Sequence, residues 1–159
     1  MCGIAGISMR NRQPVPEATL AAISTHLAHR GPDGQGAIIH ANAGLAHRRL
    51  SIIDVKGGQQ PISDAKGKVH IVVNGEIYNY QRLRQQLEGD GIKFKTQSDS
   101  EVPLHLYMKY GLDFVRHLDG MYAIAILDQI ARGEILGRTL RDQLLIDEWR
   151  RKRGYLKEG

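Results

Sequence analysis

Short apolar runs separated by glycine-rich turns constrain the fold of this chain more than any other feature. Each run is too short for a helix of ordinary length, and several are rich in β-branched residues, which predicts strands. We expect strands at 4–8, 37–40, 45–50, 69–73, 121–127 and 134–136.

Helical stretches fall between these runs. Apolar residues recur at helical spacing over 20–27 and 83–87. A third helix is expected after Ser98, which has the spacing of a capping box with Glu101, or from nearer Ser100 because a proline follows closely. No internal repeat interrupts this order, and the pattern predicts an α+β domain with a largely antiparallel sheet core.

Composition restricts the class of protein. With 159 residues, 42% of them hydrophobic, the chain is long enough for one domain with a real core. A single cysteine excludes an internal disulfide framework. The sequence contains neither a secretory signal nor an 18-residue apolar run. We therefore expect a cytoplasmic protein with no membrane partner. Part of the net charge of +5 lies in the basic run at 150–153, which indicates a solvated helix end rather than a nucleic-acid site.

The only cysteine follows the initiator methionine directly. Removal of Met1 would leave Cys2 with a thiol and a free α-amine, and an amine pKa of about 7.7–8.0 allows it to act as a base near neutral pH. Such a residue can serve as a nucleophile activated by its own amine. The alternative is that Cys2 is a small buried hydrophobe at the start of a strand.

Polar clusters that a core does not require lie at several turns. Residues 29–34 have the composition of a loop that folds over a ligand. Arg49 ends a predicted strand and is either an exposed arginine or a bidentate partner for a carboxylate. Asn74 and Gly75 are either a hairpin turn or a pair of donors for one oxyanion. Asp99 is most simply interpreted as a carboxylate in the first turn of a helix, where the helix dipole stabilises it. The histidines lack ligand spacing, so no metal site is expected.

Five motifs in register resemble the glutaminase domain of asparagine synthetase, a class II glutamine amidotransferase of the N-terminal-nucleophile hydrolases. The resemblance implies an αββα sandwich of two antiparallel sheets flanked by helices, and runs from residue 1 to about residue 138. The motifs are Met-Cys-Gly-Ile-Ala-Gly at 1–6, His-Arg-Gly-Pro-Asp-Gly at 29–34, Arg-Leu-Ser-Ile-Ile-Asp at 49–54 with Gln60-Pro61, Val-Asn-Gly-Glu-Ile-Tyr-Asn at 73–79 and Ser-Asp-Ser-Glu at 98–101.

The resemblance also implies roles for individual residues. Cys2 would attack the side-chain amide of L-glutamine to form a thioester, which water hydrolyses to glutamate after ammonia has left. Asn74 and the N–H of Gly75 would hold the oxyanion. The substrate-binding residues would be Arg49 for the α-carboxylate, and Glu76 and Asp99 for the α-ammonium group.

The chain departs from the family near its end. We expect the amidotransferase domain at 1–138 and an atypical tail at 139–159, helical, with Leu140, Leu144, Leu145 and Trp149 on one face, so that the fold is incomplete at the C-terminus. No Ser-Gly-Gly-x-Asp-Ser nucleotide loop is present, so no cofactor is expected in this chain; ATP and magnesium belong to a synthetase domain that the sequence lacks.

Three functional interpretations remain open at this point. The first is the amidotransferase half of a synthetase, and the second is a stand-alone glutaminase that supplies ammonia to a separate synthase. The third is an inactive or regulatory module that binds glutamine without turnover.

Overall fold

The computed structural model describes residues 2–9, 13–51, 57–129 and 134–139. The strands are β1 (Gly3–Ser8), β2 (Gly34–His40), β3 (Ala43–Arg49), β4 (Ile62–Ser63), β5 (Val69–Ile77), β6 (Gly120–Asp128) and β7 (Glu134–Thr139). The helices are α1 (Glu17–His26), α2 (Tyr80–Gly89) and α3 (Val102–Tyr110), with the 3-10 helices η1 (Ala28–Arg30), η2 (Asp99–Glu101) and η3 (Gly111–His117).

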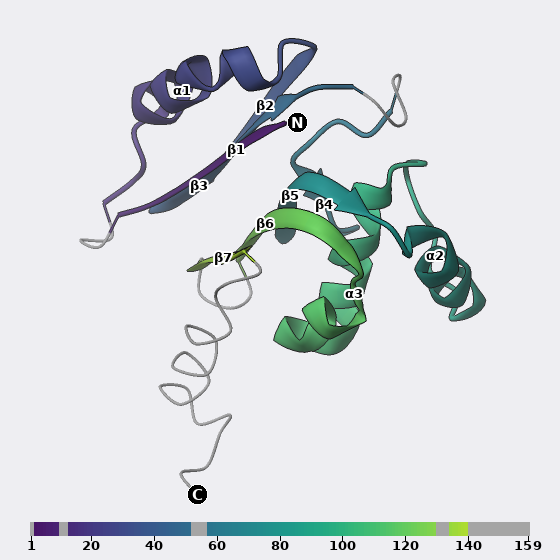
Figure 1. The fold of residues 1–159 in the computed structure, drawn as a ribbon. Coiled ribbons are helices and arrows are strands. Elements are labelled where there is room, and N and C mark those ends of the chain that lie inside the picture. The colour runs from purple at the N-terminus through teal and green to yellow at the C-terminus, as the bar shows by residue number, and fades with distance from the viewer. Residues whose placement is uncertain (1, 10–12, 52–56, 130–133, 140–159) are drawn as a thin grey trace, which may run out of the picture.

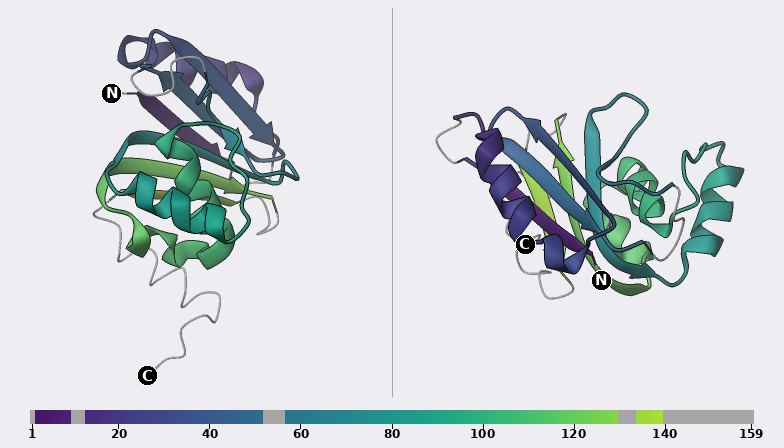
Figure 2. Two further views of the ribbon diagram at one scale, coloured as in Figure 1. Left: turned by 90° about the vertical axis from the view of Figure 1, so that its right-hand side faces the viewer. Right: turned by 90° about the horizontal axis from the view of Figure 1, so that it is seen from above.

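The elements form four layers, which are seen edge-on in the right panel of Figure 2. Helix α1 covers one face of a three-stranded sheet, a four-stranded sheet packs on its other face, and α2 and α3 cover the outside of that second sheet (Figure 1). This arrangement confirms the α+β, αββα sandwich expected from the sequence.

The first sheet has the order β1-β3-β2, with both pairings antiparallel. The central strand β3 is buried on both faces because its side chains alternate between two cores. Ala46 packs with Leu20 of α1, whereas Leu45 packs with Val72 and Leu127 of the second sheet. This burial holds the end of β3, and therefore Arg49, inside the molecule.

The second sheet has the order β4-β5-β6-β7 and is also antiparallel. Its strand β5 extends four residues beyond the predicted end, because Asn74 and Gly75 pair with β6 instead of forming a hairpin turn. The hairpin alternative is therefore wrong. The two-residue strand β4 was not predicted, since so short an edge strand carries no periodicity of its own.

The helices lie where the apolar spacing placed them, with one change at the third. Ser98 does accept a hydrogen bond from the N–H of Ser100, but α3 begins only at Val102, after η2. Glu101 does not complete a capping box with Ser98. Its carboxylate instead accepts hydrogen bonds from the N–H groups of Lys95 and Thr96, and therefore holds the preceding loop.

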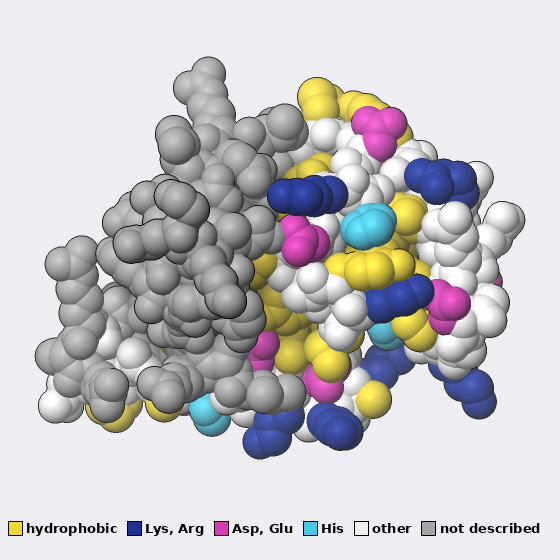
Figure 3. All heavy atoms as spheres, turned by 90° about the horizontal axis from the view of Figure 1, so that it is seen from below, with side chains coloured by type: hydrophobic (Ala, Val, Ile, Leu, Met, Phe, Trp, Pro, Cys, Tyr) yellow, Lys and Arg dark blue, Asp and Glu magenta, His cyan; other side chains and the backbone are white. Residues whose placement is uncertain are grey.

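Two further expectations meet the structure only in part. Among the described helices, none has the length and apolar character needed to cross a membrane. Strand β7 ends at Thr139, and the rest of the expected helical tail lies outside the described residues. On the described part of the face drawn in Figure 3, Lys and Arg side chains lie among Asp and Glu side chains.

Candidate active site

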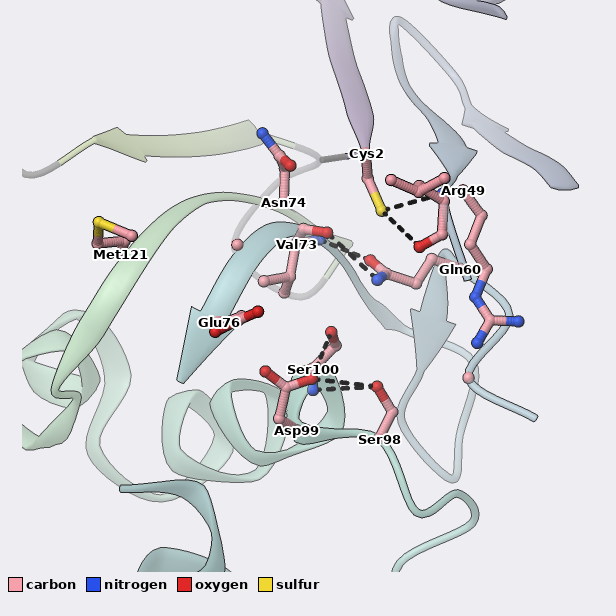
Figure 4. Close-up of a pocket in the computed structure, with 13 residues that line it drawn as sticks. Cys2, Arg49, Gln60, Val73, Asn74, Glu76, Ser98, Asp99, Ser100 and Met121 are labelled. Atoms are coloured by element: carbon pink, nitrogen blue, oxygen red, sulfur yellow. Dashed lines mark hydrogen bonds between the residues drawn. The ribbon is translucent and has the colours of Figure 1, made fainter. Parts of the chain in front are cut away.

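A pocket lies where the ends of the two sheets meet, and it contains all six residues singled out in the sequence (Figure 4). Its volume is about 190 Å³, below the roughly 300–1,000 Å³ of pockets for drug-sized ligands. The size suits a small molecule. The lining residues are Cys2, Arg49, Leu50, Gly58, Gln60, Val73, Asn74, Gly75, Glu76, Ser98, Asp99, Ser100 and Met121.

Cys2 enters the pocket directly before β1, whose register with β3 places Gly3 opposite Arg48. The N–H of Leu50 donates to the Cys2 sulfur at 3.4 Å, and the thiol donates to the Leu50 carbonyl at 3.7 Å. Arg30 Nε donates to the carbonyl of Cys2 at 3.1 Å. The thiol is half-buried rather than enclosed in a core, so the interpretation as a buried hydrophobe does not hold.

Asn74 and Cys2 lie at the same end of the pocket in Figure 4. The Asn74 Oδ1 is buried and has no hydrogen-bond partner among the described residues. Gly75 follows with φ of +141°, and a Cβ there would lie 2.0 Å from the Met121 carbonyl. Only glycine fits this position, both because of its left-handed backbone and because β6 approaches so closely.

Charged groups of opposite sign occupy different sides of the pocket. Arg49 is only 5% exposed, so its interpretation as a surface arginine is wrong. Glu76 is an exposed residue on β5, and Figure 4 shows its carboxylate across the pocket from the Arg49 guanidinium. Asp99 is 4% exposed and accepts a hydrogen bond from the Ile77 N–H at 3.0 Å, which ties η2 to the end of β5.

Ser98 and Ser100 flank Asp99, and the sequence indicated no role in the site for either of them. Their hydroxyls donate to Asp99 Oδ1 at 3.4 and 3.3 Å. They fix one oxygen of this carboxylate, while Ile77 holds the other. Their place beside Asp99 in the Ser-Asp-Ser-Glu motif was the available signal.

Two buried titratable groups support the site from behind. His47 is 1% exposed, and its Nε2 has no hydrogen-bond partner among the described residues. Burial lowers the pKa of His47 to about 4, with a smaller contribution from the charge of Arg49, against an opposing effect of the Val73 backbone. Burial also acts to raise the pKa of Glu101, but hydrogen bonds from His105, Lys95 and Thr96 outweigh it and lower that pKa to about 2.

The loop at 29–34 does not line the pocket, contrary to its expected role over a ligand. It packs instead against the end of β3: Asp33 accepts a hydrogen bond from the Ser51 N–H at 2.8 Å and donates its own N–H to the Arg49 carbonyl. A Cβ at Gly31 would lie 2.4 Å from the backbone of Arg48. The loop therefore braces the strand that carries Arg49.

No group of three or more histidine, cysteine, aspartate or glutamate residues within the described ranges is placed to hold a metal ion. The described polar groups of the pocket instead offer one thiol, one guanidinium, two carboxylates and a set of amide and hydroxyl groups. This set suits nucleophilic attack on a small molecule that carries both a carboxylate and a cationic group.

Comparison with known families decides which class of protein has this arrangement. Residues 1–144 match the family described as the glutamine amidotransferase domain. The chain belongs to this family. It is a glutamine amidotransferase domain whose sequence relatives are asparagine synthetases.

Two of these relatives show the extent of the likeness. The glutamine-hydrolyzing asparagine synthetase 2 of Oryza sativa subsp. japonica is 41% identical over 136 residues, which are 86% of this chain and 22% of that protein. The glutamine-hydrolyzing asparagine synthetase 2 of Bacillus subtilis (strain 168) is 42% identical over 132 residues, 81% of this chain and 17% of that protein. The chain thus spans about a fifth of the length of these relatives.

A solved structure supports the fold. The glutamine phosphoribosylpyrophosphate amidotransferase of B. subtilis superposes with a TM-score of 0.65 at 23% identity, over 81% of this chain and 35% of that one. At this identity the likeness concerns the fold of the amidotransferase domain alone.

Proposed function

We propose that this glutamine amidotransferase domain hydrolyses L-glutamine to glutamate and ammonia through a thioester on Cys2. The observation that carries the proposal is the convergence of the Cys2 thiol, the Asn74–Gly75 pair and charges of both signs in one pocket of about 190 Å³. A free amino acid needs such a set: one nucleophile, donors for an oxyanion, a cation for its carboxylate and carboxylates for its ammonium group.

The nucleophilic step begins with Cys2. Removal of Met1 would free the α-amine, which takes the thiol proton as the sulfur attacks the side-chain amide carbon. The tetrahedral oxyanion is held by the Asn74 amide and the Gly75 N–H. The leaving nitrogen then takes up the proton and departs as ammonia, and water cleaves the thioester to give glutamate and the free thiol.

Recognition of the substrate falls to three charged residues. Arg49 binds the α-carboxylate, and its burial at the end of β3 supports a fixed, desolvated cation. Glu76 and Asp99 bind the α-ammonium group. Because a glutamine within a peptide lacks both charges, we expect the domain to select the free amino acid.

The use of the ammonia is a further part of the proposal. Since the relatives are named asparagine synthetases, we infer that the ammonia passes to a synthase domain or subunit of the asparagine synthetase type. We also infer that glutamine hydrolysis itself needs neither ATP nor magnesium. Glutamate release should then be unchanged by a metal chelator and by omission of nucleotide.

The direct test is glutamate release by the purified chain and by two Cys2 variants. Cys2→Ala should release no glutamate yet bind glutamine with an affinity close to that of the parent. Cys2→Ser should retain only a small residue of activity, because a hydroxyl is the weaker nucleophile. Glutamate release by Cys2→Ala at the parent's rate would overturn the proposal.

Maturation offers an independent check on the same mechanism. Intact-mass measurement of the active protein should show that Met1 is absent. A protein that retains Met1 and hydrolyses glutamine at full rate would exclude the α-amine of Cys2 as the base.

A further inference from the structure

Gln60 lines the pocket, yet the reaction outlined above gives it no part. It is 7% exposed, and its side chain makes two hydrogen bonds to the main chain of one residue, Val73 (Figure 4). The Val73 N–H donates to Gln60 Oε1 at 2.6 Å, and Gln60 Nε2 donates to the Val73 carbonyl at 3.2 Å.

These bonds replace a missing stretch of edge strand. Strand β4 pairs with β5 only at Ile62 with Ile71 and at Ser63 with His70. Continued in the same register, residue 60 would stand opposite Val73, but there a side-chain amide pairs with Val73 in place of the main chain. An amide is suited to this because it offers one donor and one acceptor, as a paired strand residue does.

Without Gln60, the N–H and carbonyl of Val73 would lose these partners in a buried setting, which is costly. Val73 also stands directly before Asn74 and Gly75. Its carbonyl belongs to the peptide group that ends at the Asn74 Cα. Holding this carbonyl therefore positions the Cα from which the Asn74 side chain and the peptide group that carries the Gly75 N–H extend.

The main chain of Gln60 is itself held in place. A Cβ at Gly36 of β2 would lie 1.9 Å from the Gln60 carbonyl oxygen, so β2 packs directly against this segment. Gln60 is therefore held on two sides: the first sheet packs against its main chain, and β5 binds its side-chain amide.

We propose that Gln60 is a positioning residue of the glutaminase site, which acts through Val73 to hold the Asn74–Gly75 donors in place. The inference rests on the proposed glutamine hydrolysis. Gln60 contributes to stabilisation of the oxyanion rather than to binding of the glutamine α-groups, so its loss should lower kcat more than it raises KM.

Two variants test this role, with a matched control one residue away. Gln60→Met keeps the length of the side chain and removes both hydrogen bonds. Gln60→Glu keeps the acceptor for the Val73 N–H but directs a carboxylate oxygen at the Val73 carbonyl. Gln59→Met and Gln59→Glu make the same chemical changes at an exposed residue and should behave as the parent does.

We expect kcat for glutamine hydrolysis to fall about 10²-fold in Gln60→Met, the effect typical of a displacement of about 1 Å in a catalytic group, with KM within about threefold. In Gln60→Glu, protonation of the introduced carboxyl restores a donor to the Val73 carbonyl. The ratio of its kcat to the parent's should therefore rise as the pH is lowered from 8 to 5.5, whereas this ratio should stay flat for Gln60→Met. With kcat expressed per folded protein at each pH, a residue that merely stabilises the fold would not produce this pH profile.

Values of kcat within twofold of the parent in both Gln60 variants would overturn the inference. A ratio of kcat in Gln60→Glu to kcat in the parent that does not change with pH would also overturn it. If Gln60→Met does not fold, Gln60→Glu at low pH still tests the role. Absence of glutamate release by the parent protein would instead overturn the proposed function. Hydrogen exchange would then test the contact itself: the Val73 amide should exchange faster in Gln60→Met than in Gln59→Met, and equal rates would contradict the contact.

Discussion

The buried imidazole of His47 should make the stability of this domain depend on pH in a way that one substitution removes. In the folded state burial holds its pKa near 4, whereas the ordinary value is 6.5. The unfolded chain therefore binds a proton at His47 between these two values, while the folded chain does not. Stability from this residue is present above pH 6.5 and is lost as the pH falls toward 4.

The magnitude follows from the two pKa values. The full difference between 6.5 and about 4 corresponds to about 3 kcal/mol. At pH 5 the unfolded state is mostly protonated at His47 and the folded state mostly is not, so the free energy of unfolding is about 2 kcal/mol lower than at pH 8 from this group alone. That is a sizeable part of the roughly 5–15 kcal/mol by which most domains are stable.

Urea unfolding followed by circular dichroism at pH 8 and pH 5 measures this effect. His47→Asn removes the titrating group, so the loss of stability between the two pH values should be about 2 kcal/mol smaller than in the parent. His29→Asn removes an exposed imidazole and serves as the matched control. An equal pH dependence in His47→Asn and the parent would refute the reasoning, as would an NMR titration of His47 with a midpoint near 6.5.

Three further predictions follow from single contacts. Gly75→Ala should abolish glutamate release and lower the free energy of unfolding by at least about 1–3 kcal/mol, because its Cβ would lie 2.0 Å from the Met121 carbonyl; parent-like activity and urea midpoint would contradict this. Arg49→Ala should raise KM for glutamine about 10- to 100-fold with little change in kcat, since a charged hydrogen bond contributes about 1.5–3 kcal/mol; steady-state kinetics that show a fall in kcat alone would make the assigned role wrong. Glu101→Gln should be less stable than the parent by about 3 kcal/mol at pH 7, because hydrogen bonds hold the Glu101 pKa at about 2. The difference in free energy of unfolding between the two proteins, measured with urea, should become smaller as the pH falls from 4.5 toward 2. A difference that does not change with pH would argue against a buried carboxylate.

The sequence predicted the elements of the fold well wherever their cause is local. Strand β3 follows from its apolar run, and α2 follows from the helical spacing of Leu83 and Leu87. The extension of β5 through Gly75 was missed because Asn-Gly is the strongest local signal for a hairpin turn, and pairing with β6 overrides that signal here. The predicted capping box at Ser98 does not form for a similar reason, since the Glu101 carboxylate accepts hydrogen bonds from the Lys95 and Thr96 N–H groups of the loop before it.

For the site, sequence reasoning supplied the residues but not their surroundings. The resemblance to a known family named Cys2, Asn74, Gly75, Arg49, Glu76 and Asp99, and the structure brings all of them into one pocket. The burial of Arg49 could not be read from its own position, because it depends on packing between two sheets. Gln60 and Val73 are 13 residues apart in the sequence, and their contact exists only because β4 is so short. No local sequence pattern predicts it.

Capture of the acyl-enzyme by hydroxylamine tests the central claim most directly. A glutamyl thioester on Cys2 should react with hydroxylamine to give γ-glutamyl hydroxamate and the free thiol, in competition with hydrolysis to glutamate. The account predicts that the purified chain, given glutamine and hydroxylamine, forms the hydroxamate, and that Cys2→Ala forms neither the hydroxamate nor glutamate. Hydroxamate produced by Cys2→Ala as fast as by the parent would contradict a mechanism in which Cys2 carries the thioester.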